Sequence, residues 1–317
     1  GEYVIDEPTA VRYNELGDFA QRFMQAMPDE EPYINLYPIY AGSYGTSTYD
    51  AYIEEYIDKV PTKTLSYDYY GLMSTPGQIT SDYYMNLDLV RSKTLKYRMP
   101  FWVITQAGAV DARKQPTEKE ERWSVWSNIA GGSKGISYFC YWTPSEFDDY
   151  MIERDGTKTD MYYYIQKLNA DINTIGKKLL PAHADGVILS NIKYYPLYDN
   201  AGKGRTKYGP IQSVSAVSNH VAVGCFRDAR RSENGENYKG YKVLVVAQNP
   251  AKDITTRLTL DTSVTSITVT QNNTSKVVNL TNLTSVKVAD ENGIDLNYAD
   301  GKLTLNIPEG EALLIEF

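Results

Sequence analysis

Residues 3–8, with the sequence YVIDEP, form a short apolar run that ends in two adjacent acids and a proline. Similar short runs recur at 33–40, 64–71, 99–108 and 135–142. Between them lie segments whose apolar residues repeat at helical spacing, at 9–27, 49–60, 81–97, 119–132 and 160–180. Apolar strands that alternate with amphipathic helices are typical of a parallel sheet covered by helices. Thr9 is expected to cap the first helix.

The pattern changes after residue 209. From 210 to 317 the chain contains short, partly alternating apolar runs separated by Asn, Asp and Gly turns. This pattern predicts a β-sandwich of roughly eight strands. We therefore expect a (β/α) barrel part of catalytic type over 1–182, a connecting segment over 183–209 and a C-terminal β-sandwich over 210–317.

Composition and charge exclude several classes of function. The formal net charge is −8 and no basic block is present, which argues against nucleic acid as a partner. No apolar run approaches the ~20 residues that span a bilayer. Cys140 and Cys225 lie far apart in apolar runs, so we interpret both as buried thiols. His183 and His220 are interpreted as structural, and we expect neither a metal nor a cofactor.

The glycine-rich stretch at 131–135 does not indicate a dinucleotide site. It lies between an expected helix and an expected strand, whereas the dinucleotide fingerprint requires a strand followed by a helix. We interpret Gly131 and Gly132 as a helix C-cap and turn. Trp123 and Trp126 lie three residues apart on the preceding helix and are interpreted as core.

The ends of the expected strands carry acids, amides and aromatic residues. In a parallel β/α barrel, chemistry takes place at the carboxyl ends of the strands. The composition adds to this pattern, because the chain holds 28 tyrosines against 7 phenylalanines, and a tyrosine offers a sugar both an apolar face and a hydroxyl. The residues at the ends are Asp6, Glu7, Asn35, Tyr37, Asp68, Tyr69, Tyr70, Gln106, Tyr141 and Trp142.

The order DEP, NLYP, SYDYY, PFWVITQ and GISYFCYW, followed by a long helix and a β-sandwich, resembles a known family. It is similar to the second half of the clan A (β/α)8-barrel glycoside hydrolases, and the C-terminal part resembles domains appended to barrel glycosidases of gut bacteria. The resemblance implies a TIM-type barrel and a secreted, periplasmic or cell-surface bacterial protein. It places Glu7 as the acid/base, because DEP stands where that superfamily has Asn-Glu-Pro at strand four. Asp6 then replaces the Asn that contacts the sugar 2-hydroxyl, and Trp142 matches an aromatic platform.

The chain departs from the family pattern in two places. The family nucleophile is a Glu at the end of strand seven, where this chain has Gln106 and no carboxylate. If YVIDEP is strand four, strands one to three are not in this chain, and a half barrel exposes two sheet edges. We therefore expect a missing N-terminal segment or a second chain to complete the barrel.

These observations predict a glycosidase that cleaves O-glycosidic bonds of a plant or host glycan. Glu7 is the expected general acid, since burial and the charge of Asp6 would raise its pKa. Asp68 is the best second carboxylate, and its position two strands away suits the ~6.5–9.5 Å separation of an inverting pair. Alternatively, Asp68 binds a sugar hydroxyl or an arginine, and Asp6 makes a structural hydrogen bond.

The remaining strand-end residues are assigned to substrate binding. Candidate stacking residues are Tyr37, Tyr69, Trp102 and Trp142, although Trp102 lies mid-strand and fits a core position equally well. Candidate hydroxyl-binding groups are Asn35 and Gln106, and Asp6 and Tyr141 are further substrate-binding candidates. A second class of function is an inactive barrel that binds oligo- or polysaccharide, which Gln106 favours. A third class is a surface scaffold that binds no saccharide.

Overall fold

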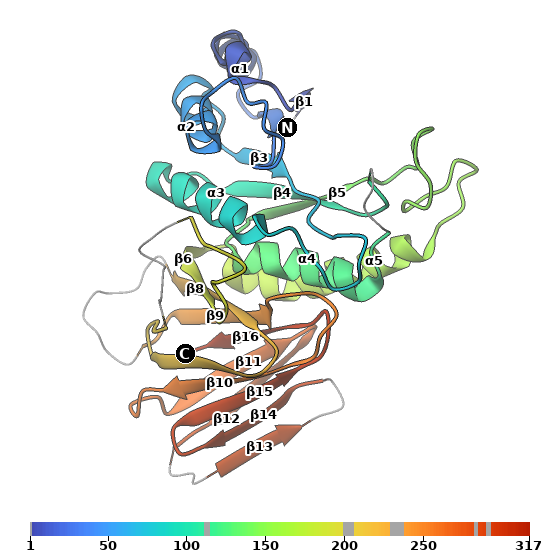
Figure 1. Cartoon of the computed structure of the whole chain (residues 1–317). Coiled ribbons are helices and arrows are strands. Elements are labelled where there is room, and N and C mark those ends of the chain that lie inside the picture. Colours follow the sequence, from blue (N-terminus) through green and yellow to red (C-terminus); the bar gives the residue numbers. More distant parts are fainter. Residues whose placement is uncertain (1, 111–114, 199–205, 229–237, 282–284, 290–292) are drawn as a thin grey trace.

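The computed structural model describes residues 2–110, 115–198, 206–228, 238–281, 285–289 and 293–317. It has a mixed α/β fold in which a curled parallel sheet is followed along the chain by two antiparallel sheets, whose strands alternate between the sheets in the sequence (Figure 1). In the ranges that the structure describes, no helix has both the length and the apolar character needed to cross a membrane.

The parallel sheet contains five strands in the order β1-β2-β3-β4-β5, which is also their order in the sequence. Each strand overlaps one of the expected apolar runs, and all four pairings are parallel, so this part of the fold prediction is confirmed. The carboxyl ends of the strands therefore lie at one edge of the sheet. The strands are β1 (Glu2–Asp6), β2 (Pro32–Leu36), β3 (Leu65–Asp68), β4 (Phe101–Gln106) and β5 (Gly135–Phe139).

Helices connect the strands and lie on one side of the parallel sheet (Figure 1). They are α1 (Tyr13–Ala26), α2 (Tyr49–Lys59), α3 (Tyr83–Tyr97), α4 (Glu118–Ala130) and α5 (Asp160–Leu179). Thr117 caps α4 in a full capping box with Glu120. The Thr9 cap was predicted wrongly: a 3-10 turn, Ala10–Arg12, precedes α1, and the Thr9 side chain makes no cap hydrogen bond. Gly132, with φ +103°, forms the expected turn after α4.

The antiparallel part consists of two sheets. One has the order β13-β14-β15-β10-β7 and the other β12-β11-β16-β9-β8-β6. The strands are β6 (Ala182–Leu189), β7 (Ile211–Ser218), β8 (Val221–Asp228), β9 (Tyr241–Ala247), β10 (Ile254–Leu260), β11 (Ser266–Gln271), β12 (Thr274–Asn279), β13 (Ser285–Ala289), β14 (Asp295–Ala299), β15 (Lys302–Ile307) and β16 (Ala312–Glu316).

Strand β6 falls largely within the range 183–209 that the sequence suggests is a connecting segment. It pairs antiparallel with β8 and forms the edge of the six-stranded sheet. The polar start of this strand, from His183 to Asp185, carries no alternating apolar pattern, so the sequence did not reveal it. Part of the expected connection, residues 199–205, lies outside the described residues.

Helix α4 packs against both the parallel sheet and an antiparallel sheet. Trp123 and Trp126 are fully buried, as expected for core residues. The Trp123 indole N–H donates a 2.8 Å hydrogen bond to the carbonyl of Ala247 at the end of β9. At Gly224 on β8, an added Cβ would come within 2.3 Å of the Ala130 carbonyl oxygen, so only glycine permits this approach.

The two cysteines are both free thiols, which agrees with the expectation of no disulfide. Cys225 is buried in β8, as expected. Cys140 is only partly buried, because it follows the end of β5, where the chain leaves the sheet. Its Sγ lies 3.1 Å from the carbonyl oxygen of Trp142.

Candidate functional site

Three carboxyl groups meet at the carboxyl ends of β1, β2 and β3. The amide Nδ2 of Asn35 donates to Asp6 Oδ1 at 3.0 Å and to Asp68 Oδ1 at 2.8 Å. Asp6 pairs with Asn35 across β1 and β2, and Asn35 pairs with Ser66, two residues before Asp68. Because side chains alternate along a strand, Ser66 and Asp68 share one face of the sheet. Asn35 therefore links the two aspartates.

A hydrogen-bond chain holds the Asn35 amide in this orientation. The Ser66 hydroxyl donates to Asn35 Oδ1 at 3.1 Å, and the Tyr33 hydroxyl lies 2.6 Å from Ser66 Oγ. A serine hydroxyl has a single hydrogen, so Tyr33 must be the donor in the second contact. With its oxygen occupied by Ser66, Asn35 presents both N–H groups to the aspartates.

Glu7 is placed by its backbone. Its φ of +45° lies in the left-handed region, and its N–H donates a 2.8 Å hydrogen bond to the carbonyl of Asn35. Burial, followed by the charges of Asp68 and Asp6, raises the pKa of Glu7 to about 8. The Glu7 carboxyl is therefore protonated at neutral pH.

Asp68 is the most buried member of the cluster, with 5% of its surface exposed. Burial raises the pKa of Asp68 to about 6, while the hydrogen bonds from Asn35 and Glu7 act in the opposite direction. The hydrogen bond between the two carboxyls raises the pKa of Glu7 and lowers that of Asp68. The pKa of Glu7 is thus the higher of the two, so Glu7 is the member of the pair that favours the protonated form.

Tyrosines surround the carboxyl cluster. Burial, followed by the charges of Glu7, Asp6 and Asp68, raises the pKa of Tyr37, which is half-buried. Burial, followed by the charge of Asp68, also raises the pKa of Tyr70, whose ring centroid lies 5.8 Å from that of Phe139. The structure therefore brings Tyr37 and Tyr70 to the acids.

Tyr3 also reaches the cluster, although no pattern in the sequence selects it. Burial, then the charge of Asp6 and a hydrogen bond to it, raise the pKa of Tyr3. Simple alternation along β1 would put Tyr3 and Asp6 on opposite faces, but a register shift between Tyr3 and Ile5 reverses this. For Tyr70 the sequence did contain a signal. Tyr70 follows Asp68 by two residues, and residues two apart along an extended chain lie on the same face.

Tyr69 points away from the acids. Its hydroxyl bonds to Thr80 Oγ1 and to Asp82 Oδ1, both at 2.6 Å, and its ring packs edge-on against Tyr83 of α3. Alternation explains this position, because Tyr69 follows Asp68 directly and so lies on the opposite, helix-covered face.

Gln106, at the end of β4, is buried, with 1% of its surface exposed. Its side-chain Nε2 donates to the carbonyl of Gly108 at 3.3 Å. Tyr141 and Trp142 follow β5 and are 57% and 51% exposed. None of the contacts described in the structure joins these two aromatics to the carboxyl cluster.

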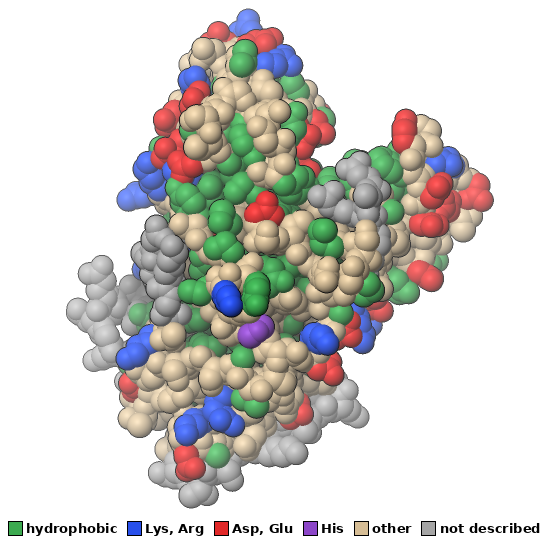
Figure 2. All heavy atoms as spheres, in the orientation of Figure 1, with side chains coloured by type: hydrophobic (Ala, Val, Ile, Leu, Met, Phe, Trp, Pro, Cys, Tyr) green, Lys and Arg blue, Asp and Glu red, His purple; other side chains and the backbone are tan. Residues whose placement is uncertain are grey.

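Trp102 lies at the other end of the sheet. Its ring centroid is 5.9 Å from that of Tyr33, and its side chain lines a cavity at the amino-terminal ends of the strands. The surface in Figure 2 shows hydrophobic side chains, tyrosine among them, gathered around the parallel sheet, with charged side chains mostly toward the periphery.

A buried tyrosine of α2 ties together two of the loops that bear site residues. The Tyr52 hydroxyl donates to the carbonyl of Pro8 at 2.8 Å and accepts from the N–H of Tyr37 at 3.2 Å. The loop after β1 and the loop after β2 thus share one hydrogen-bonding atom. This contact fixes the position of Tyr37 relative to Glu7.

The described part of the chain contains no group of three His, Cys, Asp or Glu side chains arranged to hold a metal ion. The Asn35 amide bridges Asp6 and Asp68, and a hydrogen bond joins the Glu7 and Asp68 carboxyls. Its chemistry is that of a paired acid and carboxylate at the rim of a parallel sheet, flanked by tyrosines.

No protein-family model matches the sequence. No curated protein matches it either.

Solved structures that resemble this chain include glycoside hydrolases. One is a family 39 glycoside hydrolase from Bacteroides cellulosilyticus WH2, with 10% identity, a TM-score of 0.44, and coverage of 98% of this chain and 63% of the other. A family 5 glycoside hydrolase from Bacteroides vulgatus ATCC 8482 has 9% identity, a TM-score of 0.41, and coverage of 97% and 67%. A family 51 alpha-L-arabinofuranosidase from Bifidobacterium longum has 9% identity, a TM-score of 0.42, and coverage of 97% and 63%. This chain thus spans about two thirds of the length of those proteins.

Proposed function

We propose that this chain is part of a glycoside hydrolase that cleaves an O-glycosidic bond of a plant or host glycan, with Glu7 as general acid. The observation that carries the proposal is the convergence of Asp6, Glu7 and Asp68 at the carboxyl ends of the strands, where Asn35 bridges the two aspartates and burial raises the pKa of Glu7. A general acid must be protonated at the working pH, and a pKa of about 8 for Glu7 meets that requirement.

In the proposed reaction, Glu7 gives its proton to the oxygen of the departing sugar as the bond from that oxygen to the anomeric carbon breaks. Asp68 takes a proton from the water that adds to the anomeric carbon. An inverting pair of carboxyls stands ~6.5–9.5 Å apart, with room for this water. Glu7 and Asp68 are in hydrogen-bonding contact, so the sugar must displace the Glu7 carboxyl from Asp68 when it binds.

Substrate contacts follow from the same geometry. Asp6 offers hydrogen bonds at the end of β1, and Tyr37 and Tyr70 lie beside the acids. We assign Asn35 to positioning, since its amide hydrogens are used by Asp6 and Asp68. We assign Trp142 and Tyr141, which are exposed after β5, to more distant sugar units. We assign Tyr69 to support, since its hydroxyl is used by Thr80 and Asp82.

The proposal extends to the architecture. We interpret the curled parallel sheet as the second half of a (β/α)8 barrel, beginning at strand four, and the two antiparallel sheets as a β-sandwich. A further segment or chain would complete the barrel. A secreted, periplasmic or cell-surface location in a bacterium accords with a glycan substrate.

The test is release of reducing sugar from a broad glycan panel by the chain and by its Glu7→Gln variant. Glu15→Gln is the matched control, because Glu15 is an exposed acid of α1 paired with Arg12. Release by the chain and by Glu15→Gln, with none from Glu7→Gln, would support the proposal. Equal release by all three would refute the role of Glu7.

A second candidate function is saccharide binding without cleavage. Gln106 favours it, because an amide stands where the resembling family has its nucleophilic carboxylate. This alternative predicts no sugar release by any variant, together with saccharide binding by both the chain and Glu7→Gln. A chain that is folded yet neither binds nor cleaves glycans would contradict both functions.

A further inference from the structure

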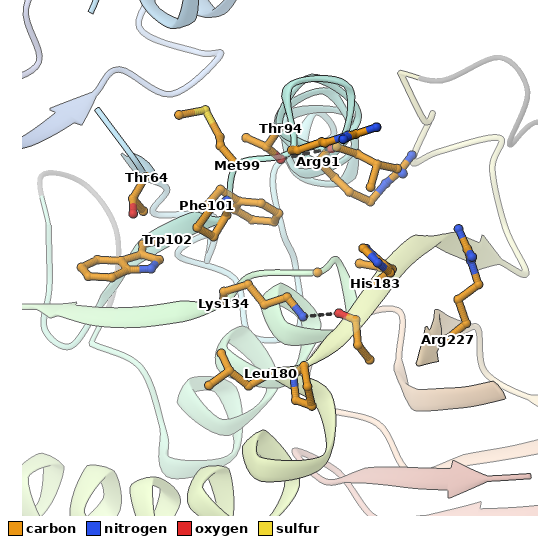
Figure 3. Close-up of a pocket in the computed structure, with 17 residues that line it drawn as sticks. Thr64, Arg91, Thr94, Met99, Phe101, Trp102, Lys134, Leu180, His183 and Arg227 are labelled. Carbon is orange, nitrogen blue, oxygen red and sulfur yellow. Dashed lines mark hydrogen bonds between the residues drawn. The ribbon is translucent and has the colours of Figure 1, made fainter. Parts of the chain in front are cut away.

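A cavity of about 790 Å³ opens at the amino-terminal ends of the parallel strands, the opposite end from Glu7 and Asp68. Its walls come from the start of β4, the end of α3, the turn before β5, the end of α5 and the strands β6 and β8. This volume lies within the ~300–1,000 Å³ typical of small-molecule sites. The close-up in Figure 3 shows the residues that line it.

The two sides of the cavity differ in character. Met99, Phe101 and Trp102 lie together on one side in Figure 3, with Leu180 below them. Arg91, His183 and Arg227 lie on the other side, and Lys134 reaches between the two groups. An apolar wall therefore faces a basic one.

The cavity has more positively charged side chains than carboxylates to neutralise them. Arg91 pairs with Asp88 and Arg227 with Asp185, but none of the described residues that line the cavity is an acid. Among the described residues, no ion pair joins a carboxylate to Lys134 or to Arg98. The cavity therefore has an uncompensated positive charge.

Lys134 shows this imbalance most clearly. Its ammonium group donates to two backbone carbonyls, those of Leu179 at 2.7 Å and Ala182 at 2.6 Å. Burial lowers the pKa of Lys134 to about 8. Two carbonyls leave one of its three hydrogens available, and an anion in the cavity would stabilise the charged form.

We propose that this cavity binds a single-chain amphiphilic anion, a carboxylate or phosphate monoester with an apolar tail. The headgroup lies against Arg98, His183 and Lys134, and the tail against Met99, Phe101 and Trp102. The site is separate from the proposed sugar chemistry and does not depend on it, because the two lie at opposite ends of the sheet.

The experiment is titration calorimetry of the whole chain with decanoate, decyl phosphate, decanol and inorganic phosphate. Decanoate and decyl phosphate are expected to bind, and decanol about tenfold more weakly, because it lacks the charge but keeps the tail. Inorganic phosphate, which lacks the tail, is expected to bind about tenfold more weakly than decyl phosphate. Equal affinity for decanoate and decanol, or no binding of either anion, would overturn the proposal.

Variants locate the site. Arg98→Gln combined with His183→Gln is expected to weaken decanoate binding about tenfold. Both side chains are exposed, so the fold should survive, and a thermal melt verifies this. Arg257→Gln, at an exposed arginine of β10, is the matched control and should leave binding unchanged.

A second variant tests the site without removing a charge. Ala184 lines the cavity, and Ala184→Leu would fill part of the space that the tail occupies. It is expected to weaken decanoate binding about tenfold while preserving the fold. Unchanged binding in folded Ala184→Leu and in folded Arg98→Gln/His183→Gln would place the amphiphile elsewhere and refute the assignment.

Discussion

The side-chain amide of Asn35 donates a 2.8 Å hydrogen bond to the Asp68 carboxylate, and this contact opposes the burial that raises the pKa of Asp68. Asn35 therefore determines how far the Asp68 carboxyl can remain ionised inside the sheet. Hydrogen bonds from Tyr33 to Ser66 and from Ser66 to Asn35 hold the Asn35 amide in this orientation.

Replacing Asn35 should change both stability and pH dependence. Asn35→Ala leaves two aspartates without their shared donor, and we expect a loss of about 1–3 kcal/mol in the free energy of unfolding. The pKa of Asp68 should rise, which moves the acid limb of any kcat/KM profile to higher pH. Urea unfolding and a pH–rate profile measure the two effects.

The control for Asn35→Ala is Asn306→Ala, because Asn306 accepts a 2.9 Å side-chain hydrogen bond from Thr255 in the antiparallel sheet. Its stability should fall while the pH profile stays unchanged. An Asn35→Ala variant whose acid limb does not move would contradict the role assigned to Asn35.

The pH profile of the unaltered chain should be bell-shaped. Activity needs Glu7 protonated and Asp68 ionised, so kcat/KM should decline above about 8 and below about 6. The two values belong to an interacting pair and will appear as macroscopic limbs. Sugar release measured across this range provides the check, and a profile that is flat through it would rule out the proposed acid and base.

Glu121 of α4 should make stability fall as pH rises. This carboxyl is 1% exposed, and burial raises its pKa from 4.5 to about 8. Between these values the unfolded chain has lost a proton that the folded chain keeps, so the folded state loses stability on the order of a few kcal/mol by pH 8. Glu121→Gln should flatten this decline.

Chemical unfolding at several pH values measures the effect of Glu121→Gln. The control is Glu118→Gln on the same helix, where the carboxylate pairs with Lys167 at 3.4 Å on the surface. A decline equally steep in Glu121→Gln and in the unaltered chain would show that other groups cause it.

Tyr52 and Tyr49 offer a matched pair on α2. The Tyr52 hydroxyl joins Pro8 to Tyr37, whereas the buried Tyr49 hydroxyl has no hydrogen-bond partner among the residues that the structure describes. Tyr52→Phe should lower the free energy of unfolding by about 1–2 kcal/mol and weaken sugar binding, since Tyr37 loses its support. Tyr49→Phe should be neutral or stabilising. Thermal melts compare the two, and equal losses would mean that the bridge contributes nothing.

Arg122 should couple the two parts of the chain. Its buried guanidinium pairs with Asp171 of α5 at 2.9 Å and with Glu311 at 2.7 Å, and it donates to Asn272 at 2.9 Å. Arg122→Met leaves these acids unpaired and should cost about 3–5 kcal/mol. Lys119→Met, which removes the more exposed pair with Glu309, should cost about 0.5 kcal/mol. Calorimetry should show one transition in the unaltered chain and a loss of cooperativity in Arg122→Met only.

The parallel strands and helices could be predicted because each is encoded locally. The run MPFWVITQAG contains β4, and the helical spacing of apolar residues marks α1 and α5. The site was predictable in part for the same reason, because acids and amides follow the strands. The alternation of side chains along a strand also predicts that Tyr70 shares the face of Asp68 and that Tyr69 does not. Tyr3 and Ser66 could not be found, because their roles depend on a register shift and on a cross-strand neighbour.

Other features depend on contacts between distant parts of the chain. Strand β6 begins with polar residues and exists because β8 pairs with it. The cavity beside Lys134 forms where β4, α5 and β6 meet, and no segment of sequence contains all three. The contact between Glu7 and Asp68 likewise depends on the positions of two separate strands.

Helix α4 limits how the two parts of this protein could be exchanged by recombination during evolution. Nearly all of its residues are buried, and they pack against β4 on one side and β9 on the other. A gene fusion that replaced everything after residue 190 would remove Ala247 and Gly224, which contact Trp123 and Ala130 of this helix. Recombination that exchanged the antiparallel sheets would also require substitutions at the buried residues of this helix. The two parts are therefore expected to evolve together.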